Sequence, residues 1–171
     1  NLNVDASTAF GTGQHETTKG CLLQFDHLLK SEKFDNVLDL GCGTAILAMA
    51  AAKVGVPYVF ASDIDPEAVR VSKLNAKLNQ LQGRMDAVVS TGFDNHQLAK
   101  RGPYDLIFAN ILARPLVGLA KPIGQNLCSG GYAILAGLLI NQETMVRATY
   151  QNQGMKLVRR LHMGEWSILL V

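Results

Sequence analysis

The chain has 171 residues, of which 48% are hydrophobic and 18% are charged, and this length and composition favour one globular domain with an ordinary core. Its net charge is +2, too small to indicate a nucleic-acid-binding surface, so we expect no direct nucleic-acid partner. No apolar run reaches membrane-spanning length, and three cysteines without a CxxC pair favour a reducing cytoplasm.

Short apolar runs alternate with helical patterns along the chain, which is typical of a parallel sheet covered by helices. The sequence predicts helices over residues 17–29, 46–54, 66–79, 114–127 and 142–151. It predicts strands over residues 37–40, 58–62, 87–90, 106–109 and 132–136. Two further strands, 156–162 and 166–170, are joined only by residues 163–165, a link that requires an antiparallel hairpin. We therefore predict an α/β fold with a parallel sheet and a C-terminal antiparallel hairpin.

The segment AFGTGQHETT, residues 9–18, precedes the first predicted helix. Gly11 and Gly13 bracket Thr12, and Thr17 and Thr18 open the helix, a composition that gives a flexible loop with hydroxyl donors. Two interpretations stay open. The segment is either a lid over the carboxyl end of the sheet or an ordinary N-terminal coil with Thr17 as the helix cap.

The segment VLDLGCGTAILA, residues 37–48, joins the first predicted strand to its helix through two glycines. Gly41 and Gly43 lack side chains, which lets the backbone turn sharply and approach a ligand closely. Asp63 ends the next strand, where an acidic side chain accepts hydrogen bonds from ribose hydroxyls. The alternative for Asp63 is a helix cap, but Asp65, directly before Pro66, is better placed for that role. The glycines and Asp63 together favour an adenosine ligand.

A dinucleotide site would have a third glycine at position 46, where this chain has Ile46. S-adenosylmethionine carries ribose and adenine but no phosphate, and its sulfonium is positive, so a carboxylate beside the turn favours it. Asp39 is placed to receive the ammonium group of that cofactor, directly or through water. A strand-end carboxylate bonded to loop amides is the structural alternative. We predict an S-adenosylmethionine site, with a nicotinamide-dependent oxidoreductase as the alternative.

Asn110 follows the fourth predicted strand in the segment FANILARP. In an open α/β sheet the ligand crevice lies outside the carboxyl ends of the strands. We predict that the Asn110 side-chain carbonyl accepts a hydrogen bond from an acceptor amine and orients its lone pair; a structural asparagine in a left-handed turn is the alternative. Ile111 and Leu112 stand where methyltransferases of base amines usually carry a stacking aromatic ring, which favours an aliphatic amine. The histidines have no metal-ligand spacing, so we expect no metal site.

Five segments, GTGQHETT, VLDLGCGTAILA, ASDID, FANILARP and the closing GEW, resemble in this order the catalytic domain of the ribosomal protein L-eleven methyltransferase family (PrmA-like). The resemblance covers nearly the whole chain. It implies a class I S-adenosylmethionine-dependent methyltransferase fold, Rossmann-like, and an enzyme that methylates lysine side chains or an N-terminal amine of a ribosomal protein. It also implies that residues 1–171 are a single catalytic domain without the separate N-terminal substrate-recognition domain of the family.

The resemblance also assigns residues by position. It implies cofactor contacts for Thr18, Gly41, Asp63 and Asn110, and it places Phe10, Gly11, Thr12 and His15 in a loop that closes over the cofactor. The chain departs from the family pattern at Ala45, where a glycine is common, and at Glu16, where a proline is common. A module that binds S-adenosylmethionine without transferring a methyl group is a further alternative.

Overall fold

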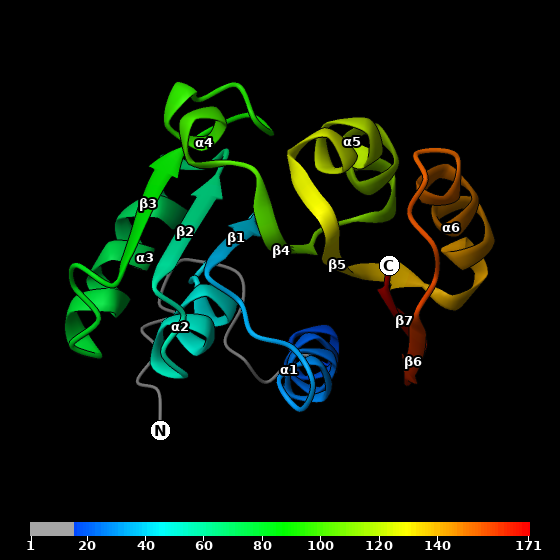
Figure 1. The fold of residues 1–171 in the computed structure, drawn as a ribbon, viewed down its shortest axis with the longest axis horizontal. Helices are drawn as coiled ribbons and strands as arrows, with labels where there is room; N and C mark the ends of the chain where they lie inside the picture. The colour runs from blue at the N-terminus through cyan, green and yellow to red at the C-terminus, as the bar shows by residue number, and fades with distance from the viewer. Residues whose placement is uncertain (1–15) are drawn as a thin grey trace.

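The computed structural model describes residues 16–171, which form one seven-stranded sheet with helices on both faces (Figure 1). The strands are β1 Asn36–Leu40, β2 Tyr58–Asp63, β3 Met85–Val89, β4 Tyr104–Asn110, β5 Leu127–Leu139, β6 Arg159–Met163 and β7 Trp166–Leu170. Their order is β3-β2-β1-β4-β5-β7-β6; β1 to β5 are parallel, and β7 is antiparallel to β5 and β6. The predicted sheet with its C-terminal hairpin is confirmed, although only Gly164 and Glu165 separate β6 from β7.

Five helices begin and end within one residue of the predicted bounds. They are α1 Glu16–Leu28, α2 Ile46–Lys53, α3 Pro66–Leu78, α5 Ala113–Asn126 and α6 Glu143–Gln151. The sequence did not predict α4 His96–Arg101 or the short 3-10 helix η1 Ile140–Gln142. Only Leu98 is buried in α4, so this helix has no apolar period to reveal it.

Two helix starts test the capping predictions. The Asp65 carboxylate accepts a hydrogen bond from the Glu67 amide at 2.9 Å, which confirms Asp65 as the cap of α3. Thr17 is the second residue of α1, so the interpretation of Thr17 as the helix cap is wrong.

The sheet separates two hydrophobic cores. α1, α2 and α3 pack with the first core, and α4, α5 and α6 pack with the second (Figure 1). Consecutive residues of β1 face opposite cores: Val37 belongs to the first and Leu38 to the second, and both are fully buried. Burial on both faces explains why the central strands read as continuous apolar runs. Among residues 16–171 no helix is long and apolar enough to cross a membrane.

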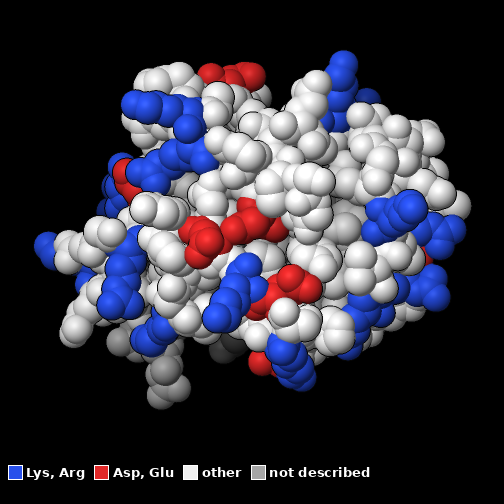
Figure 2. All heavy atoms as spheres, viewed as in Figure 1, with Lys and Arg blue, Asp and Glu red and all other residues white. Residues whose placement is uncertain are grey.

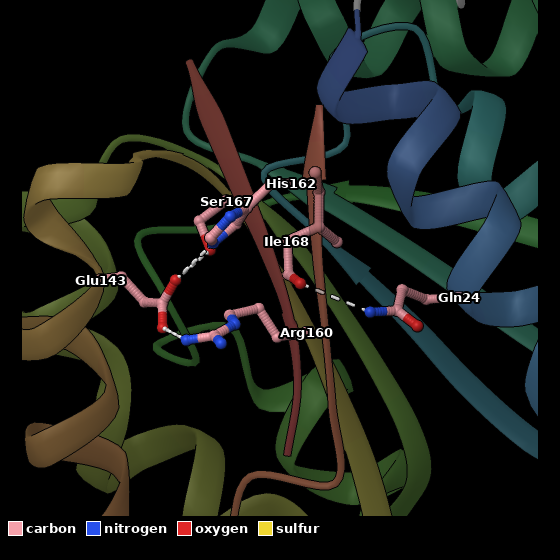
Figure 3. A network of polar contacts seen from close by, with 6 residues as sticks. All are labelled: Gln24, Glu143, Arg160, His162, Ser167 and Ile168. Carbon is pink, nitrogen blue, oxygen red and sulfur yellow. Dashed lines mark hydrogen bonds and ion pairs between the residues drawn. The ribbon is translucent and has the colours of Figure 1, made fainter. Parts of the chain in front are cut away.

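A buried carboxylate fastens the C-terminal hairpin to the second helix layer (Figure 3). The side chain of Glu143, the first residue of α6, is 8% exposed and accepts hydrogen bonds from Arg160 Nη1 at 3.0 Å and Ser167 Oγ at 2.9 Å. His162 Nε2 lies 2.8 Å from the same carboxylate. Burial alone would raise the pKa of Glu143, but the hydrogen bonds from His162, Arg160 and Ser167 outweigh burial and lower it to about 2.

Gln24 of α1 holds the other face of the hairpin (Figure 3). Its fully buried side-chain amide donates to the Ile168 carbonyl oxygen at 3.3 Å and accepts from Arg159 Nη1 at 3.0 Å. Polar contacts from both helix layers therefore fix the register of the antiparallel edge.

We expect Glu143→Gln to lower the free energy of unfolding by about 1–3 kcal/mol at pH 7, because Arg160 and His162 lose a charged acceptor. The pKa of Glu143 is lowered on folding, so its stabilisation is present above pH 4.5 and is lost as the pH falls towards 2. Urea unfolding between pH 2 and 7 measures this. The difference between the chain and the variant should shrink with acid, whereas Asp26→Asn, which breaks the exposed pair with Lys30, should change stability by less than about 0.5 kcal/mol.

Candidate active site

The predicted site residues of the described chain gather at the carboxyl ends of β1, β2 and β4, with Thr18 of α1 beside them. β1 and β4 are neighbours, yet α2 after β1 and α5 after β4 pack in opposite cores, so the order of the sheet reverses between these two strands. Ligands of open α/β sheets bind at such a point. Phe10, Gly11, Thr12 and His15 lie outside the described residues, so their assignment stays a prediction.

The glycine turn after β1 requires both of its glycines. Gly41 has φ +73° and Gly43 has φ +52°, a left-handed region that other residues enter only at a cost. The amides of Gly41 and Cys42 both donate to the Ser62 carbonyl oxygen, at 2.8 and 2.9 Å, which ties the turn to the end of β2. A side chain at Gly41 would also overlap the Ile111 side chain. The turn therefore exposes its own backbone rather than side chains at the crevice.

Ile111 lies between Gly41, in the turn after β1, and Gly137 of β5. Its side chain packs against Gly41, and its backbone packs so closely on Gly137 of β5, where φ is +85°, that a Cβ there would overlap the Ile111 carbonyl group. The Ile111 amide donates to the Ala136 carbonyl oxygen at 3.1 Å. From the sequence, Ile111 was noted only because it stands where an aromatic ring is usual, and Gly137 was not predicted to belong to the site. The signal for Gly137 was a glycine near the end of an apolar strand, which often marks a close backbone approach.

Asp63 organises the loop that follows β2. One carboxylate oxygen accepts the Gly43 amide at 2.9 Å, and the other accepts the Asp65 amide at 3.0 Å. The residue is half-buried, and each oxygen has a second lone pair. Asp63 thus connects the glycine turn to the start of α3, while ribose binding by the same carboxylate stays a prediction.

Asp39 is buried at the end of β1 with 1% of its surface exposed. Its carboxylate accepts the Ala48 amide at 3.0 Å, in the first turn of α2, where the cap residue Ala45 has no polar side chain. The structural alternative for Asp39 therefore holds in part, with a helix amide in place of loop amides. Burial raises the pKa of Asp39 to about 7; the Ala48 hydrogen bond opposes this shift, and the charge of Asp63 adds to it.

The departure at position 45 has a local consequence. Ala45 adopts φ 60° and ψ 32°, a left-handed conformation that glycine enters without strain. This explains why a glycine suits the position. The backbone keeps the turn even with alanine, so the departure does not distort the route from Gly43 into α2.

Two carboxylates without a counter-charge dominate the electrostatics of the crevice. No Lys, Arg or His of residues 16–171 forms an ion pair with Asp39 or Asp63. A positive ligand would favour the charged form of both acids, including Asp39 with its raised pKa, whereas a pyrophosphate would be repelled by them. The donor set therefore fits a cationic adenosyl ligand and does not fit a dinucleotide.

Asn110 and Thr18 meet at the same edge from distant parts of the chain. The Asn110 side-chain nitrogen donates to Thr18 Oγ1 at 3.4 Å, and Thr18 is 2% exposed in the first turn of α1. This contact leaves the Asn110 side-chain carbonyl oxygen without a hydrogen-bond donor from the part of the chain that the structure describes. The free oxygen has the chemistry required to accept an N–H group from an amine.

Cys42 is a packed thiol rather than a nucleophile. Burial and the nearby Asp39 charge raise the pKa of the thiol, and its sulfur lies 3.4 Å from Ser72 Oγ. Within residues 16–171 no group of three or more His, Cys, Asp or Glu side chains is arranged to hold a metal ion.

Comparisons with known proteins agree with this geometry. A family model described as ribosomal protein L11 methyltransferase (PrmA) matches residues 1–171. The chain is 47% identical over 171 residues to the ribosomal protein L11 methyltransferase of Caulobacter sp. (strain K31), an alignment that covers 100% of this chain and 59% of the relative. It is 48% identical over 170 residues to that of Bradyrhizobium diazoefficiens, covering 99% of this chain and 58% of the relative. The chain thus spans less than two thirds of the length of these relatives.

Solved structures show the same fold. The ribosomal protein L11 methylase of Lactobacillus delbrueckii subsp. bulgaricus superposes with a TM-score of 0.85 at 30% identity, covering 99% of this chain and 83% of that chain. A precorrin 8W decarboxylase from Methanobacterium thermoautotrophicum superposes with a TM-score of 0.75 at 18% identity, and the alignment covers 99% of this chain and 95% of that chain. A TehB-like SAM-dependent methyltransferase from Corynebacterium glutamicum superposes with a TM-score of 0.65 at 14% identity, and the alignment covers 89% of this chain and 95% of that chain. The fold is that of the class I methyltransferases.

We expect Gly41→Ala to lower the free energy of unfolding by about 2–5 kcal/mol, because left-handed strain and overlap with Ile111 both act there. Gly55→Ala is the matched control: its φ is +98°, but a Cβ there meets nothing within 4 Å, so only about 1–2 kcal/mol is expected. Adding Ile111→Ala to Gly41→Ala should recover part of the loss. Equal effects of the two glycine substitutions in urea unfolding would contradict the packing of Ile111 on the turn.

We expect the stability of the chain to fall as the pH rises from about 4 to about 7, because the folded state keeps a proton on Asp39 that the unfolded state has already released. Asp39→Asn removes this titration and should be more stable than the wild type by about 1–3 kcal/mol at pH 8 and by much less at pH 4. Chemical unfolding at both pH values measures the difference. Asp94→Asn, at an exposed position, is the control and should change stability equally at pH 4 and pH 8. An effect of Asp39→Asn that is the same at both pH values would argue against the raised pKa.

Proposed function

The chain belongs to the ribosomal protein L11 methyltransferase (PrmA) family, and from that premise we propose that it is an S-adenosylmethionine-dependent enzyme that methylates amines of a ribosomal protein. One observation carries the proposal. The carboxyl groups of buried Asp39 and half-buried Asp63 lie beside a glycine turn with no counter-cation from residues 16–171, so a cationic ligand would stabilise their charged forms. S-adenosylmethionine brings positive charge and a ribose without phosphate, and both properties match this crevice.

We assign the residues of the crevice to parts of the cofactor. The backbone of Gly41 and Gly43, with Asp39, would hold its amino-acid end, and Asp63 would hold the ribose hydroxyls. Thr18 and Asn110 would lie beside the methyl group, and Phe10, Gly11 and Thr12 would belong to the closing loop. When bound, the cofactor supplies an electrophilic methyl group on a positive sulfur.

The chemistry asked of the protein is modest. A lysine amine with a pKa of about 10.4 is neutral in roughly one molecule in 2500 at pH 7, so the reaction requires an amine with a free lone pair. Exclusion of water from the crevice and a nearby positive charge both favour the neutral amine. The free carbonyl oxygen of Asn110 would then accept an amine N–H group and hold the lone pair in line, with the proton lost to water.

The further expectations form part of the same proposal. Residues 1–171 would act as one catalytic domain, since residues 16–171 share a single sheet flanked by two cores. The site of action would be the cytoplasm, where ribosomes work and where the free Cys21, Cys42 and Cys128 stay reduced.

We expect Asn110→Ala to lower the rate of radiolabelled methyl transfer to purified ribosomal protein L11 by about 100-fold, because the amine loses its orienting acceptor. The affinity for S-adenosylmethionine, measured by calorimetry, should change by less than about tenfold. Asn152→Ala, at the exposed end of α6, is the control and should keep the full rate.

Three results would overturn the proposal in different ways. Tighter binding of NADH than of S-adenosylmethionine would indicate an oxidoreductase. Cofactor binding without methyl transfer to any amine-bearing protein would indicate a binding module. An Asn110→Ala variant with the wild-type rate would remove Asn110 from the reaction.

A further inference from the structure

A second feature lies away from the crevice, where β2 and β3 begin. A hollow of about 560 Å³ is lined there by Tyr58, Lys73, Arg84 and Arg101, among other residues. An adjoining hollow of about 480 Å³ is lined by His96, Gln97, Lys100 and Arg101. Arg101 lines both hollows, and we call the residues that line the two hollows together the basic groove. None of its lining residues belongs to the candidate active site.

The basic groove concentrates positive charge. Four Lys and Arg side chains line it, against the single carboxylate of Asp86, whereas the whole chain has 16 Lys and Arg against 14 Asp and Glu. Asp86 approaches Lys73 only at 3.9 Å, and both side chains are more than half exposed, so this pair neutralises little of the field. Figure 2 shows Lys and Arg side chains gathered over α4 and the adjacent strands β2 and β3.

The groove also presents an exposed aromatic ring and a guanidinium group that is held in place. Tyr58 is 62% exposed, unusual for a large ring at the start of a strand. The Arg101 guanidinium carbon lies 4.4 Å above the centre of the Phe60 ring, and the Arg101 carbonyl oxygen accepts from Asn36 Nδ2 at 2.7 Å. Arg101 is thus held by both its backbone and its side chain, which reduces the entropy it would lose on binding an anion.

We propose that the basic groove binds the phosphate backbone of single-stranded RNA, with the Tyr58 ring stacking on a base. Guanidinium groups pair with phosphates in two-point contacts, and an exposed ring stacks only on a base that is not already paired in a duplex. An acidic peptide would pair with the Lys and Arg side chains of the groove, but it would not account for the exposed ring of Tyr58. The choice of RNA over DNA rests on the proposed function, because the proposed acceptor is a ribosomal protein and therefore itself a partner of RNA. The groove itself goes beyond that function.

The sequence concealed this surface. Its four cations stand at positions 73, 84, 100 and 101, on three different elements or loops, and only the fold brings them together. The expectation of no nucleic-acid partner was based on the net charge, which averages over all faces of the molecule.

Fluorescence anisotropy of a labelled 20-nucleotide oligouridine tests the proposal. Four phosphate contacts predict that log K falls with log salt at a slope of about −3. Arg84→Gln with Lys100→Gln should flatten the slope by about 1.4 and weaken binding at least tenfold. Lys121→Gln with Lys156→Gln removes the same net charge from exposed positions outside the groove and should keep the wild-type slope. Equal losses in the two double variants, or no binding by the wild type, would overturn the proposal.

Two further arms separate the alternatives. Tyr58→Ala should weaken binding at least fivefold while Tyr58→Phe should not, because only the ring is required; equal affinities of both variants with the wild type would refute stacking. Unlabelled polyglutamate that displaces the labelled RNA as well as unlabelled oligouridine does would assign the groove to an acidic peptide instead.

Calorimetry with S-adenosylmethionine should give the same affinity for every variant, which shows that each variant is folded. Failure of the wild type to bind that cofactor would refute the methyltransferase function and leave the anisotropy result standing on its own.

Discussion

Asp39 lies near the end of the inner strand β1 with 1% of its surface exposed, and burying a carboxylate there costs free energy that the surroundings must offset. The surroundings offset it only in part. The Ala48 amide provides one hydrogen bond at the start of α2, where the positive end of the helix also favours an anion. The pKa of Asp39 nevertheless rises to about 7. The glycine turn, the start of α2 and the nearby Asp63 are all arranged around a charge that the described chain leaves unbalanced.

Glu143 shows what a fully satisfied buried acid looks like in the same molecule. Its carboxylate has three side-chain partners, and its pKa falls to about 2. Asp39 is also buried, but the Ala48 amide is its single hydrogen-bond donor among the described residues, and its pKa moves in the opposite direction. The contrast separates two uses of a buried charge: Glu143 fixes the hairpin against α6, whereas Asp39 remains available to a cationic ligand.

Much of this architecture could be predicted because the central strands are buried on both faces and the helices have strong apolar periods. The hairpin followed from the short link alone. The helix α4 could not be predicted, since a single buried residue, Leu98, gives no period. The sequence also placed Asp39, Gly41, Asp63 and Asn110 at strand ends. It did not reveal that Ile111 packs against Gly41 and Gly137, or that cations from distant positions share the basic groove, because both depend on contacts between segments far apart in the chain.

Positions 41, 111 and 137 are 26 to 96 residues apart in the sequence but meet in the fold. The Ile111 side chain fills the space beside Gly41, and the Ile111 carbonyl group fills the space beside Gly137. Which residues fit at positions 41 and 137 therefore depends on residue 111. A larger residue at 41 would require a smaller side chain at 111, because the Ile111 side chain occupies that space. No substitution at 111 would make room at 137, because the backbone of Ile111 is what a side chain there would meet. Paired changes at 41 and 111 could therefore compensate each other sterically, whereas position 137 requires glycine whatever side chain stands at 111. Leu112, which is 69% exposed, lies outside both contacts.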